Sequence, residues 1–190
     1  MRQLVLMTLF LFSGCYLKAQ ESDRWTNFQR RMVGHGQKFL FTEVFTLQEG
    51  ETSVLKVKKL HFEALETSGY ACNMLGYQYQ GETGIVMSTI TESDLDLNAL
   101  VLNSNRLTHS EIRLLNEALM EMLTAKVAAG EQLLRRLNDR MVIKLLRDTG
   151  SFISDVTYLI LAIDDEVRVR LTVKKWKQVH EKYMKFVWEA

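Results

Sequence analysis

Hydrophobic positions in the first half of the chain change from a helical to an alternating spacing. Trp25, Phe28 and Met32 follow one another at helical spacing, which predicts an amphipathic helix over residues 22–33 that ends at the two glycines of residues 34–36. The segments that follow are rich in β-branched and aromatic residues, which favour strands. We therefore expect a meander of four strands at residues 38–47, 53–66, 70–79 and 84–91, with turns at 48–51 and 80–82.

The middle of the chain carries a helix start followed by a long apolar pattern. Residues 93–103 fit either a strand or a capped helix, and we assign them to a helix. Thr108 and Glu111 have the spacing of a capping box. The apolar positions after them predict a helix over residues 108–149, which is either one long helix or a helical hairpin that bends near residues 128–130.

The last third of the chain predicts a hairpin and a terminal helix. Residues 156–163 are apolar on both faces, and residues 167–174 alternate between apolar and polar side chains, so both segments are expected to be strands. Trp176 and Tyr183 belong to the apolar side of the terminal helix. The whole pattern predicts an α+β fold. In it, a mainly antiparallel sheet (the early meander plus the C-terminal hairpin) packs against the long central helix or helical hairpin and against the C-terminal helix. No internal repeat is visible.

The N-terminus has the pattern of an export signal. Arg2 precedes an apolar run at residues 4–12, and the small residue Ala19 follows, so residues 1–19 are predicted to be a signal peptide. Residues 20–190 then form a single α+β domain of ordinary length. The apolar run is about half of the roughly 20 residues that span a bilayer, so we expect no transmembrane span in the mature chain.

Two processing routes are open at this signal. Cleavage after Ala19 would place the protein in the periplasm or outside the cell. Residues 12–15 resemble a bacterial lipobox, which would instead attach a lipid anchor at Cys15. By either route Cys72 has no disulfide partner within the chain, and its apolar neighbours indicate a buried thiol.

Charge is balanced overall but unevenly distributed. The chain holds 24 Lys and Arg against 23 Asp and Glu, so it has no general attraction to nucleic acid, and we expect no nucleic-acid partner. Basic residues gather in the last strand and helix, where Arg168 and Arg170 alternate with apolar residues. These two arginines are either a solvated strand face or a contact for an acidic partner. With Trp176 and Tyr183 of the terminal helix, they are the candidate partner-binding residues.

The sequence lacks the common motifs of catalysis and of metal binding. There is no HExxH, CxxC or GxSxG motif and no phosphate-binding loop, so we expect no cofactor and no metal. His61 and Glu63 share one face of a predicted strand and are the weak candidates for a catalytic pair, together with an acid from residues 92–96. A structural role is the alternative interpretation of both residues.

These observations favour binding over catalysis. The sequence predicts an exported bacterial envelope protein, a binding or assembly module that acts through protein–protein contacts with another envelope protein. One alternative is a small periplasmic enzyme whose site is assembled from distant residues. Another is an inhibitor or immunity protein, or a subunit of a transport or conjugation apparatus.

Overall fold

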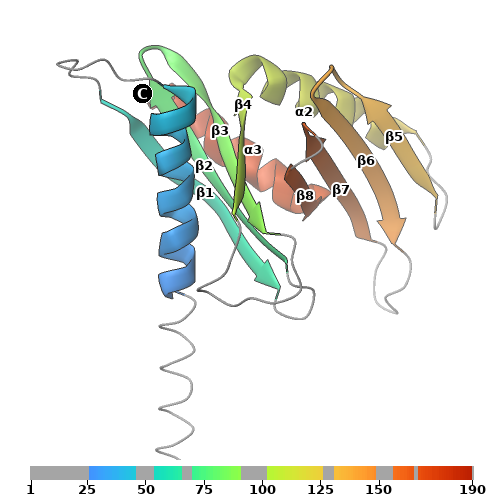
Figure 1. Cartoon of the computed structure of the whole chain (residues 1–190). Coiled ribbons are helices and arrows are strands. Elements are labelled where there is room, and N and C mark those ends of the chain that lie inside the picture. The colour runs from blue at the N-terminus through green and yellow to red at the C-terminus, as the bar shows by residue number, and fades with distance from the viewer. Residues whose placement is uncertain are drawn as a thin grey trace, which may run out of the picture.

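Two four-stranded antiparallel sheets, each followed by a helix, organise the described part of the chain (Figure 1). The computed structural model describes residues 26–45, 54–65, 70–90, 102–125, 131–148, 156–164 and 167–189. In both sheets the strands are neighbours in chain order, so each sheet is a meander. The predicted α+β class is confirmed.

The same succession of elements occurs twice along the chain. The first sheet consists of β1 (Lys56–Leu65), β2 (Tyr70–Tyr79), β3 (Glu82–Ile90) and β4 (Asn103–Thr108), and the helix α2 (His109–Thr124) follows it. The second sheet consists of β5 (Gln132–Arg136), β6 (Met141–Asp148), β7 (Val156–Ile163) and β8 (Val167–Thr172), and the helix α3 (Val173–Trp188) follows it. Each half of the described structure is therefore four strands and a helix.

The two strand-to-helix junctions repeat in detail. Thr108 caps α2 by accepting a hydrogen bond from the backbone N–H of Glu111, and Thr172 caps α3 in the same way from Lys175. The capping box predicted at Thr108 is confirmed. Four buried positions in each helix then follow the cap at identical spacings, namely Ile112, Leu115, Leu119 and Met122 in α2 and Trp176, Val179, Tyr183 and Phe186 in α3, and α2 buries Ala118 in addition.

One hydrophobic core joins the two halves. It takes side chains from the inner faces of both sheets and from both helices, including Met74, Met87, Leu119, Leu145, Leu161 and Tyr183. The helix α3 contacts β1 and β2 of the first sheet as well as β7 and β8 of the second. Since burial of apolar surface is the main stabilising term in folding, neither half can keep its inner face buried without the other.

The N-terminal helix covers the outer face of the first sheet (Figure 1). It runs over residues 26–39 and continues as the π-helical turn η1 (Leu40–Val44). Every fourth residue is buried against the sheet: Phe28, Met32, Gly36 and Leu40. Their neighbours in the sheet include Ala71, Leu75, Tyr77, Val86 and Ile90.

The predicted end of this helix at residues 34–36, and the predicted strand at 38–47, are wrong. A Cβ atom on Gly36 would lie 3.1 Å from Ser88 Oγ and 3.3 Å from Leu75 Cδ1, so this glycine allows the helix to lie close to the sheet. The aromatic residues that suggested a strand belong instead to the continuing helix and to η1. The predicted turn at 48–51 lies outside the described residues.

The predicted helix over 108–149 is also wrong beyond Thr124. The chain forms β5 and β6 there, because Met141, Ile143 and Leu145 point into the core while the residues between them do not. The turn between these strands is held by Asn138 Oδ1, which accepts hydrogen bonds from the backbone N–H groups of Arg140 and Met141.

The other predicted strands and the terminal helix are confirmed in type and approximate bounds. Residues 91–101, which include most of the segment assigned to a helix, lie outside the described residues, and so do residues 1–25 with the predicted signal and Cys15. Cys72 is buried, and burial raises the pKa of its thiol to about 12. No helix in the described part of the chain is long and apolar enough to span a membrane.

The two helical glycines give a matched test of this packing. Gly36→Leu should lower the free energy of unfolding by about 1–3 kcal/mol, because the side chain has no room between the helix and the sheet. Gly34→Ala should raise it by about 0.5–1 kcal/mol, because alanine favours the helix and a Cβ at this position meets nothing within 4 Å. Chemical denaturation followed by circular dichroism measures both changes. Equal effects of the two substitutions would contradict the close approach at Gly36.

Candidate functional site

The outer face of the second sheet is uncovered by any described element (Figure 1). Along β6, β7 and β8, buried residues that point into the core alternate with partly or fully exposed residues that point away from it. The corresponding face of the first sheet lies beneath the N-terminal helix. The two outer faces therefore differ in their cover, although both inner faces share one core.

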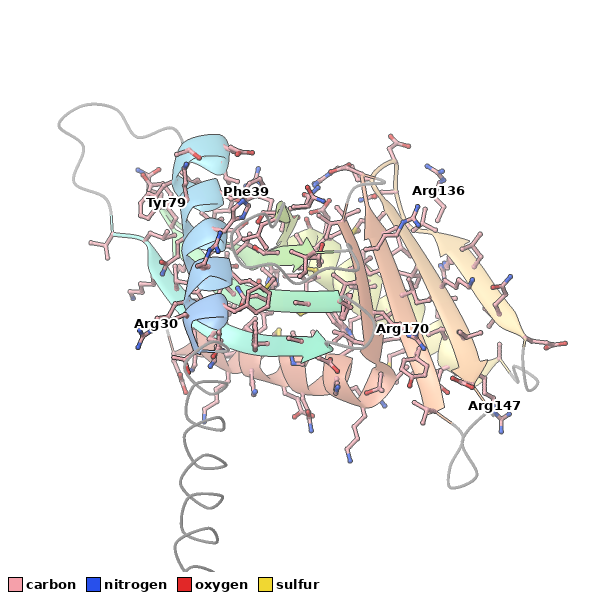
Figure 2. The ribbon with its side chains drawn as sticks, turned by 60° about the horizontal axis from the view of Figure 1, so that its bottom comes forward. Arg30, Phe39, Tyr79, Arg136, Arg147 and Arg170 are labelled. Atoms are coloured by element: carbon pink, nitrogen blue, oxygen red, sulfur yellow. The ribbon has the colours of Figure 1, made fainter. Side chains whose placement is uncertain are left out.

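The strand register places Val142, Ala162 and Ile160 at the centre of this face, with Lys144 beside them on β6 and arginines on both edge strands. One row across the sheet joins Arg136, Val142, Ala162 and Arg168. The next row joins Leu134, Lys144, Ile160 and Arg170. We call these two rows, together with Leu146 and Tyr158 of the following row, the cationic face. Figure 2 labels Arg136 and Arg170, which come from the edge strands β5 and β8.

Arg170 is held in place from two sides. Its guanidinium carbon lies 4.3 Å from the centre of the Tyr158 ring, which is a cation–π contact. Its backbone N–H donates to Tyr70 Oη at 3.0 Å, and the Tyr70 hydroxyl lies 3.3 Å from its backbone oxygen. Burial raises the pKa of Tyr70, so the hydroxyl keeps its proton at neutral pH. The guanidinium is thereby positioned before any ligand arrives.

The four cations of this face have no acidic partner among the described residues. Every ion pair found there involves other basic side chains. Arg136, Arg168 and Arg170 are exposed to solvent, and Lys144 is half-buried. Unpaired cations around an apolar centre attract an anionic partner and orient it.

Arg140 connects the two sheets beside this face. Its guanidinium makes three contacts of 3.0–3.1 Å with the Asp164 carboxylate, one of 3.0 Å with Glu111 Oε1 and one of 2.7 Å with Asn105 Oδ1. Asn105 in turn donates to Asp164 Oδ2 at 2.7 Å. The hydrogen bonds from Arg140 hold the pKa of Asp164 below its usual range. This network is a structural tie between β4, α2 and the two turns of the second sheet.

The structure brings the catalytic candidates His61 and Glu63 together, but Lys175 of α3 also contacts Glu63. His61 Nε2 lies 3.4 Å from Glu63 Oε2, and Glu63 Oε1 accepts a hydrogen bond from Lys175 Nζ of α3. Lys182 Nζ donates to the Leu60 backbone oxygen at 3.1 Å. Burial lowers the pKa of His61, against the opposing effect of Glu63. These contacts fasten α3 to β1, and the acid expected from residues 92–96 lies outside the described residues.

The partner-binding candidates fall in two different places. Arg168 and Arg170 lie on the cationic face, whereas Trp176 and Tyr183 are only 1% and 0% exposed and belong to the core. The Tyr183 hydroxyl donates to Thr83 Oγ1 at 3.3 Å and lies 2.9 Å from His109 Nδ1. Trp176 and Tyr183 thus anchor α3 to its neighbours, and a partner cannot reach them on the folded surface.

Sequence reasoning missed the β5 and β6 contributions to the cationic face. Arg136, Val142 and Lys144 fell within a predicted helix, so no sheet face was expected there. The signal that could have found them is the alternation of Met141, Ile143 and Leu145 with the residues between them.

A pocket also lies between α2 and α3. Its volume is about 230 Å³, and His109, Glu117 and His180 are among its lining residues. Within the described segments, no group of three His, Cys, Asp or Glu side chains is arranged to hold a metal ion. Neither observation identifies a reactive centre.

Replacing Arg140 should loosen the connection between the sheets. Arg140→Ala is expected to lower the free energy of unfolding by about 1–2 kcal/mol, a modest value because solvent screens these partly exposed side chains. A carboxylate whose pKa is lowered by folding stabilises the protein above its unfolded pKa, about 3.9, and loses that contribution as the pH falls. The variant should therefore show a shallower loss of stability between pH 5 and pH 3.

Urea denaturation at several pH values measures this difference. Arg113→Ala is the control, because Arg113 is exposed and pairs only with Glu117 one helical turn away. An Arg140 variant that matched this control in both stability and pH dependence would show that the network adds nothing to the fold.

The half-buried His61 should make the fold sensitive to mild acid. Since folding lowers its pKa, the folded protein binds fewer protons than the unfolded chain, and stability falls as the pH drops below about 6.5. His61→Gln should reduce the loss of stability between pH 7 and pH 5, leaving the part due to His35 and His180, whose pKa values are also lowered by burial. Glu63→Gln should increase that loss, because the carboxylate raises the pKa of His61. Thermal melts across this pH range measure the effect. The same pH dependence in the original protein, His61→Gln and Glu63→Gln would show that His61 does not contribute to the acid sensitivity.

The sequence and the fold were compared with known proteins. No protein-family model matches this chain, and neither a curated protein nor a solved structure is similar to it. The interpretation of the cationic face rests on the contacts, burial and charges of this chain.

Proposed function

We propose that this chain is a non-catalytic binding module that contacts another protein through the cationic face. The observation that carries the proposal is an open sheet face with an apolar centre and four cations that have no acidic partner among the described residues. The matching face of the first sheet lies beneath a helix of the same chain. An apolar centre with a charged margin is the usual composition of a protein–protein interface.

The proposed setting is the bacterial envelope. The sequence pattern of residues 1–19 supports export, either with cleavage after Ala19 or with lipid attachment at Cys15. The partner would then be another envelope protein. In this setting the module would act as an assembly factor, an inhibitor or a subunit of a larger apparatus.

The contacts of His61 and Glu63 give less support to a catalytic function. A general base needs access to the proton that it removes. Glu63 is engaged by Lys175, and both His61 and Glu63 lie at the junction between β1 and α3. Their contacts instead account for the attachment of α3 to the first sheet.

Site-specific photo-crosslinking in cells tests the proposed surface. A photoreactive phenylalanine analogue replaces Ile160 at the centre of the cationic face, or Met120 as a control that is 48% exposed on α2. We expect a reproducible protein adduct from position 160 and none from position 120. The adduct should disappear when Arg168→Glu and Arg170→Glu are added. Adducts from position 120 alone, or from neither position, would contradict the proposal.

A further inference from the structure

We infer that the occupant of the cationic face is a single amphipathic helix of the partner, with an apolar stripe flanked on both sides by Asp or Glu. This inference rests on the proposed function and specifies the chemistry of the partner. It follows from the size of the face, from the way the first sheet is covered, and from the placement of the four cations.

The dimensions of the face match one helix. Its central strands β6 and β7 have eight residues each, which corresponds to a length of about 26 Å, and four strands span a width of about 14 Å. A helix of about 17 residues has the same length and a diameter of about 10–12 Å with its side chains. One helix laid along β6 and β7 therefore fills the face.

The charge of the face disfavours a second copy of this chain as the occupant. Two copies that met through this face would bring two sets of arginines together, and like charges across an interface repel each other. A helix with acidic flanks avoids this repulsion.

The first sheet shows how such a helix is seated on a four-stranded face of this protein. Phe28, Met32 and Leu40 of the N-terminal helix are buried against it, and Gly36 allows the close approach. On the second sheet the small side chain of Ala162 lies at the centre, between Val142 and Arg168 in its row. A ridge of apolar side chains on a partner helix can pack over this position.

The cations set the chemistry of the flanks. Arg136 and Arg168 lie on opposite edge strands, so they would meet acids on both sides of a helix that lies between them. A membrane surface is the less suitable occupant, because membrane-binding faces present protruding apolar side chains. Here Val142, Leu146 and Ile160 are half-buried and Arg170 covers the Tyr158 ring, so Leu134 on the edge strand β5 is the one apolar side chain of the cationic face that protrudes.

A peptide-binding experiment tests this assignment on the purified full chain. The probe is a fluorescent 18-residue helical peptide with a leucine stripe and glutamate flanks, and the comparison peptide has lysine flanks. We expect fluorescence anisotropy to show binding of the acidic peptide only, weakened by added salt. Arg168→Glu with Arg170→Glu should weaken this binding at least tenfold, and Arg136→Glu on the other edge strand should weaken it as well.

The control variant carries the same change of charge elsewhere. Lys174→Glu with Lys177→Glu alters two exposed residues of α3, and it should change the affinity less than threefold. Melting temperatures confirm that each variant is folded. Arg136→Glu gives an independent readout if the loss of the Arg170–Tyr158 contact unfolds the double variant.

Each other outcome overturns the inference in a different way. Equal binding of the acidic and basic peptides would remove the role of the cations. Binding to phosphatidylglycerol vesicles without binding to the acidic peptide would make the face a membrane contact. Absence of binding to either peptide and to the vesicles would refute the inference that an acidic amphipathic helix occupies the face. If the adduct from position 160 nevertheless forms in cells, the proposed function stands with a partner of different chemistry, and if that adduct is also absent, both fail.

Discussion

Shared burial of two inner sheet faces is the constraint on which the rest of this structure depends. A four-stranded sheet with one apolar face needs a second layer, and here α2 and α3 close the space between both sheets. The polar network of Arg140, Asp164 and Asn105 fixes the two halves at their junction. Because the inner faces are used for the core, the two sheets can offer their outer faces to other contacts.

One outer face is covered by a helix of the same chain and the other is open among the described residues, and the functional proposal depends on this difference. The N-terminal helix shields the first sheet with a buried residue at every fourth position. On the second sheet the central apolar residues stay half-exposed, Lys144 lies among them, and arginines occupy both edge strands. An exposed sheet face of this composition lowers its free energy when an apolar and anionic surface covers it. Of the two catalytic candidates on β1, Glu63 already pairs with Lys175 of α3.

Several elements could be predicted because their signals are local. The capping box of Thr108 and Glu111 starts α2 as expected, and β2 has its predicted bounds. The alternation of Arg168 and Arg170 with apolar residues also identified one edge of the cationic face.

The errors of prediction occurred where a helical and a strand pattern coexist. Leu134, Leu137, Met141 and Leu145 follow a helical spacing, yet Leu134 is 71% exposed and β6 uses the alternating pattern instead. The strands β4 and β8 end in the same Arg-Leu-Thr sequence, whose threonine caps the helix that follows each of them.

The sequence by itself determined the α+β class, five of the eight described strands, the N-terminal cap of α2 and the burial of Cys72, since each depends on neighbours along the chain. Only the tertiary structure decided that residues 132–136 and 141–148 are strands, that the N-terminal helix passes through Gly36, and that Trp176 and Tyr183 are buried too deeply to contact a partner. It also decided which cations share a surface, because Arg136 and Arg168 meet in one row only through the pairing of four strands. The reason is physical. The spacing of apolar residues along the chain indicates which side chains can share a face. The free energy gained by burying that face depends on residues that are distant in the chain.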